Sequence, residues 1–157
     1  MHSFWRERTP VPKTADIIAN ALYEEGVRYA YGIPGGEVLE LLEAFRKVGI
    51  KFILTKQEMG AGIMADATYQ LTGKPGVLVA TLGPGITNTT TAVAQASLDR
   101  SAVIVLTGEI ATSLKSIYTH QIIDQESLLR PIVKWTTTIA AKNAFDQVRK
   151  GIAIARQ

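Results

Sequence analysis

Segments with apolar residues at helical spacing alternate with short apolar runs along the chain from Lys13 onward. In the first segment, Thr14 or Asp16 can cap a helix that Gly26 ends. Its apolar positions recur at helical spacing, at Ile17, Ile18, Ala21 and Leu22. Helices that alternate with buried strands are typical of βα units. The pattern therefore predicts an α/β fold, with an open parallel sheet flanked by helices on both faces.

The rest of the chain continues this alternation. Its apolar runs predict strands at residues 28–33, 50–55, 76–82, 102–107 and 132–140. Helices are expected from residue 38 to Gly49, over 58–71, from the turn at 83–85 through Ser97, and over 144–156. Residues 108–124 lack a clean period, and a loop of this length is more often functional than idle. Because no strand follows the last helix, we expect either a sheet truncated before its last strand or a helix that closes the sheet edge.

Length and composition add limits to this picture. The 157 residues, 46% hydrophobic and 20% charged, predict one folded domain over residues 13–157, preceded by an extended arm over residues 1–12. The chain has no cysteine, and its only histidines are His2 and His120, so we expect no metal site within it. The net charge of +3 is scattered, which argues against a nucleic-acid partner. No apolar run is long enough to span a membrane, so a cytoplasmic location is the default expectation.

Candidate chemistry lies at the strand-to-helix turns, because ligands of open parallel sheets bind beyond the carboxyl ends of the strands. These turns are residues 34–36, 57–60 and 83–88. The last one fails as a dinucleotide fingerprint because Asn88 stands where a glycine is needed. Its glycines either permit a tight turn or allow a flat ligand to approach bare backbone.

Ionisable residues near these turns have structural and functional interpretations. Glu58 follows an apolar strand where a helix begins, so it is either a stabilising N-terminal helix acid or a functional carboxylate. Glu37 and Asp66 are interpreted as solvated helix charges. His120 is interpreted as a surface or capping histidine unless other information assigns it a function.

Taken in order, these turns resemble the pyrimidine-binding domain of thiamine-diphosphate enzymes, most closely the acetolactate synthase branch. The resemblance extends over nearly all of residues 13–157 and depends on an ordered set of short motifs. These are Tyr31-Gly32-Ile33-Pro34-Gly35-Gly36, Glu58-Met59-Gly60-Ala61, Met64-Ala65-Asp66-Ala67, Leu82-Gly83-Pro84-Gly85-Ile86-Thr87-Asn88, Val105-Leu106-Thr107-Gly108-Glu109 and His120-Gln121-Ile122-Ile123-Asp124.

The resemblance implies roles for individual residues. Glu58 is expected to share a proton with the aminopyrimidine ring of the cofactor, which activates the cofactor to attack a 2-keto acid. Gln121 is expected to face the reacting centre as a second catalytic residue. The cofactor-binding set is Pro34, Gly35, Glu58, Gly83, Pro84, Gly85 and Asn88, and the substrate-facing set is Gly36, His120 and Gln121.

The resemblance also implies parts that this sequence lacks. Family members hold the diphosphate and Mg²⁺ in a separate domain through a Gly-Asp-Gly motif, which is absent here. We therefore expect a diphosphate-binding domain in the same longer chain or in a second subunit, a homodimer or tetramer, and an isolated chain without activity. The sequence leaves retention of FAD open.

Two departures from the family pattern, Gln57 and His120, leave the exact substrate open. The leading hypothesis is an N-terminal piece of an enzyme that decarboxylates or ligates 2-keto acids. The alternatives are a separate subunit of a two-chain 2-keto acid decarboxylase and a non-catalytic nucleotide-binding module.

Overall fold

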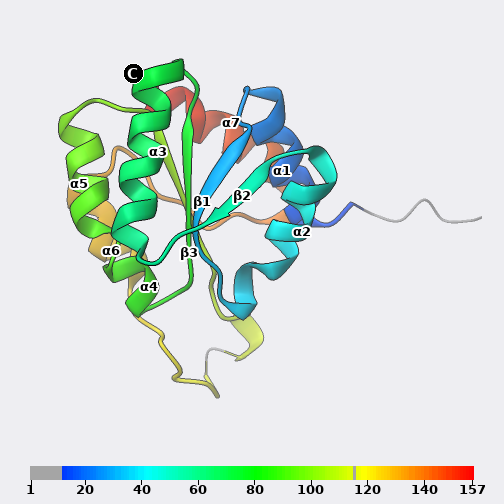
Figure 1. Ribbon diagram of the computed structural model, residues 1–157. Helices are drawn as coiled ribbons and strands as arrows, with labels where there is room; N and C mark the ends of the chain where they lie inside the picture. The colour runs from blue at the N-terminus through cyan, green and yellow to red at the C-terminus, as the bar shows by residue number, and fades with distance from the viewer. Residues whose placement is uncertain (1–11, 115) are drawn as a thin grey trace, which may run out of the picture.

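The computed structural model describes residues 12–114 and 116–157, and most of the predicted N-terminal arm lies outside them. Its centre is a parallel sheet with strand order β2-β1-β3-β4 (Figure 1). The strands are β1 (Tyr29–Ile33), β2 (Lys51–Leu54), β3 (Gly76–Ala80) and β4 (Val103–Thr107). The predicted α/β fold with a parallel sheet is confirmed.

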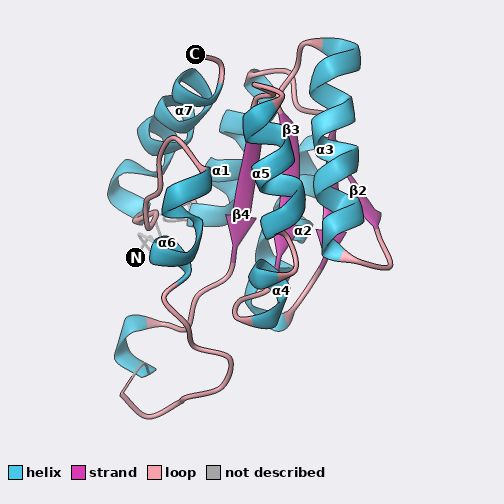
Figure 2. Cartoon of the chain, turned by 90° about the vertical axis from the view of Figure 1, so that its left-hand side faces the viewer, coloured by secondary structure: helices cyan, strands magenta, loops and turns pink. Residues whose placement is uncertain are grey.

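Helices cover both faces of the sheet, as the two views show (Figures 1 and 2). One face carries α1 (Thr14–Glu24), α2 (Leu39–Val48) and α7 (Ala144–Ala155), and the other carries α3 (Glu58–Thr72) and α5 (Thr90–Leu98). The shorter helices are α4 (Pro84–Thr87), α6 (Gln125–Leu129), η1 (Gly36–Val38), η2 (Thr112–Leu114), η3 (Arg130–Ile132) and η4 (Ala141–Asn143). The single helix predicted from residue 83 through Ser97 is thus divided into α4 and α5.

The central strand β3 separates the two halves of the core. Val77 and Val79 pack with α1, α2 and α7, whereas Leu78 packs with α3 and α5. Successive side chains of a strand point to opposite faces, so a continuously apolar strand is what a sheet covered on both sides requires. All five residues of β3 are buried, which fixes the position of the turn that follows it.

The predicted strand over residues 132–140 is wrong, because this segment is attached to α7 and not to the sheet. Lys134 Nζ donates a hydrogen bond to the carbonyl of Ala155 at 3.2 Å. The ring of Trp135 lies so close to Gly151 that an added methyl group there would be 3.1 Å from it. A groove of about 580 Å³, lined by β4 and by this segment, lies between them. Within the described residues, β4 therefore pairs only with β3.

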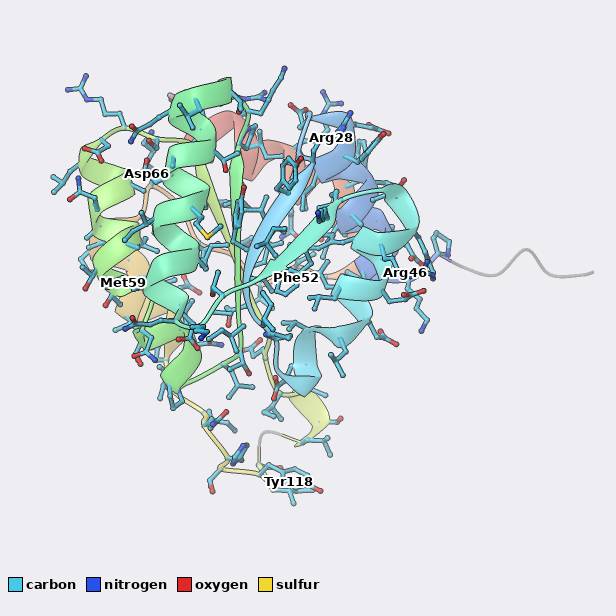
Figure 3. All side chains as sticks on the ribbon, viewed as in Figure 1. Arg28, Arg46, Phe52, Met59, Asp66 and Tyr118 are labelled. Carbon is cyan, nitrogen blue, oxygen red and sulfur yellow. The ribbon has the colours of Figure 1, made fainter. Side chains whose placement is uncertain are left out.

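The carboxyl ends of the strands lie at the lower edge of the sheet in Figure 1, where residues 108–124 form a long excursion. Tyr118 stands at the tip of this excursion, away from the sheet (Figure 3), and is 53% exposed. Apart from η2, the described part of the loop has no regular secondary structure. This agrees with the irregular sequence pattern and places the loop beside the predicted site.

Candidate functional site

Glu58 is the first residue of α3, and its side chain is held at the carboxyl edge of the sheet. The residue is only 8% exposed, and the Nδ2 of Asn88 donates a hydrogen bond to its Oε2 at 3.2 Å. Its Oε1 faces Gly85, where an added methyl group would lie 3.9 Å away. Among the described residues, no group donates a hydrogen bond to Oε1. Among the described residues, the site thus fixes one carboxylate oxygen of Glu58 and gives the other no hydrogen-bond donor.

Thr81, directly after β3, contacts both the Glu37 carboxylate and Gly85. Its hydroxyl donates a hydrogen bond to Oε2 of Glu37 at 2.8 Å. Its methyl group lies over Gly85, because an added methyl there would be 2.6 Å from Thr81 Cγ2. Gly35 lies against the same pair, with room for no side chain between Thr81 and Glu37. Thr81 is therefore hydrogen-bonded to Glu37 and lies beside Gly85, which Glu58 also faces.

The loop after β4 returns to the turn after β3 through Gln121. Gly83 has a φ of +61°, and a methyl group added to it would overlap the backbone carbonyl of Gln121. Gln121 itself has a φ of +55°, in the left-handed region. The structure thus brings Gly83 and Gln121, two residues of the predicted site, together through their backbones. His120, which precedes Gln121 in the chain, is exposed.

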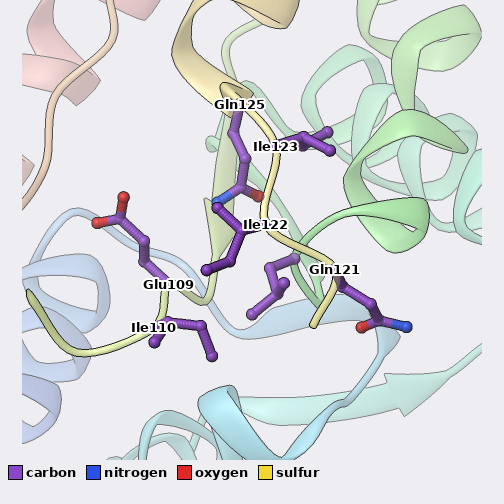
Figure 4. A pocket seen from close by; sticks show the side chains of 7 residues that line it. Glu109, Ile110, Gln121, Ile122, Ile123 and Gln125 are labelled. Carbon is purple, nitrogen blue, oxygen red and sulfur yellow. The ribbon is translucent and has the colours of Figure 1, made fainter. Parts of the chain in front are cut away.

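A small hollow of about 20 Å³ lies beside Gln121 (Figure 4). It has room for about one water molecule. The side chain of Gln125 is fixed beside it, donating to the carbonyl of Gly108 at 3.0 Å and accepting from Thr107 at 2.9 Å. The remaining lining residues are Leu82, Glu109, Ile110, Gln121, Ile122 and Ile123.

Asp124 ends the loop and caps α6. Its carboxylate accepts a hydrogen bond from the backbone amide of Ser127 at 2.9 Å. The pKa of Asp124 lies below its ordinary value because hydrogen bonds from the Ser127 side chain and backbone stabilise the charged form. The cap therefore remains ionised at neutral pH and defines where the loop ends.

The other predicted residues lie along the same edge without a common centre in this chain. Pro34 and Gly35 follow β1, and Pro84 is the first residue of α4. Gly36 faces open space, with no atom within 4 Å of where its methyl group would be. Glu58, Gly85 and Asn88 form one cluster and Gly83 and Gln121 another, and these two clusters are joined only through the turn that carries Gly83 and Gly85.

Asp66 differs from its expectation, and Glu37 has a contact that the sequence did not predict. Asp66 is not a solvated charge: it is 8% exposed and accepts a hydrogen bond from Gln70 at 2.9 Å. Glu37 is exposed, as expected, but it is bound to Thr81 at the candidate site. The only signal in the sequence for this contact is Thr81, a polar residue near the end of the predicted strand over residues 76–82.

The described residues form neither a metal-ligand cluster nor a membrane-spanning helix. Nowhere in residues 12–114 and 116–157 do three or more acidic or histidine side chains gather in a way that suits a metal ion. Within the same ranges, every helix is too short or too polar to cross a bilayer.

Comparison with known proteins identifies the family of this chain. The family described as "Thiamine pyrophosphate enzyme, N-terminal TPP binding domain" matches residues 12–128. The chain belongs to this family. Membership in the thiamine pyrophosphate enzymes confirms the resemblance inferred from the ordered turns.

The similar proteins include a 2-hydroxyacyl-CoA lyase and acetolactate synthases. The chain is 36% identical to 2-hydroxyacyl-CoA lyase 2 of Mus musculus over 151 residues, which is 96% of this chain and 24% of the relative. It is 36% identical to the acetolactate synthase isozyme 3 large subunit of Escherichia coli over 87% of this chain and 24% of the relative. Acetolactate synthase of Bacillus subtilis is 33% identical over 90% of this chain and 25% of the relative. The chain thus spans about a quarter of the length of these relatives.

Proposed function

We propose that this chain is the pyrimidine-binding domain of a thiamine-diphosphate-dependent enzyme that decarboxylates or ligates 2-keto acids. The observation that supports this best is the buried carboxylate of Glu58, with one oxygen fixed by Asn88 and the other directed toward Gly85. A buried acid with a free oxygen beside bare backbone suits a flat heteroaromatic ring with a nitrogen to protonate. The residues present therefore fit the pyrimidine half of the cofactor.

Each residue of the edge has a role in this proposal. Thiamine diphosphate, when bound, supplies the electron sink for cleaving the bond next to the keto group. Glu58 shares a proton with the ring nitrogen, and Asn88 holds its carboxylate in place. The glycines and prolines at residues 34–35 and 83–85 offer backbone to the cofactor, and Gly36, His120 and Gln121 face the substrate.

The proposal requires a second domain. A diphosphate-binding domain, in the same longer chain or in another subunit, would hold the diphosphate and Mg²⁺, as the family resemblance implies. The complete protein would then be a homodimer or tetramer, in which two domains complete each site. A cytoplasmic location remains a prediction from the sequence, and the proposal applies with or without FAD.

The role of Glu58 is testable in the complete enzyme, which combines this chain with its diphosphate-binding domain. Exchange of the cofactor's C2 proton with deuterium, followed by NMR, measures activation without any substrate. We expect Glu58→Gln to slow this exchange at least about 100-fold, the lower end of what a positioned acid or base contributes. Calorimetry with thiamine diphosphate shows separately whether the variant still binds the cofactor.

Asp66→Asn is the matched control, because Asp66 lies on the same helix, is equally buried, and contacts Gln70 at a distance from the turns. We expect its exchange rate to stay within about threefold of the unmodified enzyme, which is under 1 kcal/mol. Exchange in Glu58→Gln that is as fast as in the control would refute the proposed role.

A further inference from the structure

Glu37 directly follows Gly36, which the proposed function places toward the substrate, and its carboxylate is fixed from several directions. The Thr81 hydroxyl holds its Oε2 at 2.8 Å across 44 residues of sequence. Gly108, after β4, leaves room for its side chain, since a methyl group there would overlap Glu37 Cβ. A methyl group at Gly35 would lie 2.5 Å from Oε2. Residues that follow β1, β3 and β4 thus hold this one carboxylate in position.

No cation compensates this charge within the described part of the chain. The ion pairs found there involve Glu25, Glu40, Glu43, Asp16 and Glu126, and none involves Glu37. Lys56, the basic residue that follows β2 on the same edge, has no ion pair with a described residue either. The Thr81 hydroxyl is a neutral donor, so it orients the carboxylate without cancelling its charge. The described part of the chain therefore presents an oriented carboxylate without a cationic partner.

We propose that Glu37 selects the second substrate by charge, disfavouring acceptors that carry a carboxylate and favouring uncharged carbonyl compounds such as aldehydes. This rests on the proposed function. In the ligation, the first 2-keto acid loses CO₂, and the electron pair of the broken bond forms a new bond to the acceptor's carbonyl carbon, whose oxygen takes a proton. The reaction needs no oxidant or reductant. Between an anionic and a neutral acceptor of similar shape, the property that Glu37 would distinguish is charge.

Like charges a few ångströms apart repel enough to change selectivity even where water screens them partly. The donor 2-keto acid is anionic too, but at saturating donor its binding cancels from the comparison between acceptors. The affected quantity is therefore the ratio of kcat/KM for an anionic acceptor to kcat/KM for a neutral acceptor of similar shape.

The test uses the complete, cofactor-loaded enzyme with saturating pyruvate as donor and either 2-oxobutanoate or propanal as acceptor. These acceptors differ by one carboxylate. We expect Glu37→Gln to raise the ratio for 2-oxobutanoate over propanal about tenfold, which corresponds to one moderately screened charge contact. Thr81→Val, which removes the hydroxyl that orients Glu37, should change the ratio in the same direction by a smaller factor.

Glu24→Gln is the control for net charge, because Glu24 is exposed near the end of α1, at the opposite edge of the sheet. It removes the same charge from the protein and should leave the ratio within twofold. A ratio that Glu37→Gln changes by less than twofold, or that both variants change equally, would overturn the inference.

A binding measurement separates this inference from the proposed function. Isobutyrate and isobutyramide have nearly the same shape and differ in charge, and calorimetry measures both without turnover. Glu37→Gln should improve the affinity for isobutyrate relative to isobutyramide severalfold, with a smaller effect at high salt. If the enzyme activates its cofactor but this relative affinity does not change, only the selectivity inference fails. If C2 exchange does not depend on Glu58, the proposed function fails, and the inference fails with it.

Discussion

The contact between Gly83 and Gln121 joins two loops through backbone atoms. A side chain at residue 83 would overlap the Gln121 carbonyl and would also have to adopt a φ of +61°. Neither problem can be relieved by a rotamer change, because both belong to the main chain. The position of Gln121 in the candidate site therefore depends on the absence of a side chain at Gly83, in a different loop of the chain.

Gly83→Ala should destabilise the domain by about 2–3 kcal/mol, since backbone strain of about 1 kcal/mol or more is added to the displacement of the 108–124 loop. Chemical denaturation measures the change in the free energy of unfolding. Gly73→Ala is the matched control: its φ is +66°, but nothing lies within 4 Å of the new methyl group. It should cost only the strain of about 1 kcal/mol. Equal losses in both variants would mean that the loop contact contributes nothing.

At the scale of elements, α3 and α5 approach closely because both carry small residues at their contact. A methyl group added at Gly62 would be 2.5 Å from the Cβ of Ala92, and Ala61 and Ala65 of α3 are fully buried. This close packing fixes α3 relative to the sheet. It thereby sets the position of Glu58 at the first residue of the same helix.

Gly62→Ala should destabilise the domain by about 1–2 kcal/mol, because overpacking outweighs the better helix propensity of alanine. Gly60→Ala is on the same helix with nothing within 4 Å of the new methyl group, and should stabilise by about 0.5–1 kcal/mol. Thermal unfolding distinguishes the opposite signs. Two variants of the same sign would show that the α3–α5 contact can relax freely.

Elements were predictable where local pattern and tertiary environment agree. The apolar run of β3 and the turns around it were assigned from sequence because a doubly covered strand must be apolar throughout. The segment 132–140 is also rich in β-branched and aromatic residues, yet its Trp135 packs on Gly151 of α7. Periodicity records that a residue is buried but not which neighbour buries it, so this strand could not be excluded in advance.

The candidate site likewise combines features that have a local sequence signal with contacts that have none. The position of Glu58 at the start of a helix after a strand is visible in the sequence, and the family resemblance supplies its expected role. The bond between Glu37 and Thr81 was not predicted, because the two residues are 44 positions apart and a hydrogen bond of that range leaves no local signal. The pairing of Gly83 with Gln121 was equally hidden, since it joins two loops that no periodic pattern connects.

At the scale of the molecule, Glu25 ties the end of the chain to its beginning. Its carboxylate lies 2.8 Å from Arg156 and 3.5 Å from Arg149, and the Arg156 guanidinium also donates to the Glu25 carbonyl. Glu25 is about 20% exposed, so this ion pair is better shielded from water than the others on the surface. It connects α7 to α1 across one face of the sheet.

Glu25→Gln should lower the free energy of unfolding by about 1 kcal/mol, at the upper end for ion pairs near the surface, and by less in high salt. Urea unfolding at two ionic strengths checks both expectations. The neighbouring variant Glu24→Gln removes the same charge without a described ion pair and should change stability by under about 0.5 kcal/mol. If both substitutions have equal effects, the link between α1 and α7 does not stabilise the fold.

The different settings of the Glu37 and Glu58 carboxylates bear on how such an enzyme evolves. Glu58 is a buried side chain at the first residue of α3 and accepts a hydrogen bond from Asn88, so its replacement disturbs the interior of the domain. Glu37 is exposed, and a single base change converts its codon to that of glutamine. With the role proposed for Glu37, acceptor preference can change by mutation at little cost in stability, while replacement of the residue proposed to activate the cofactor is constrained by the packing around it.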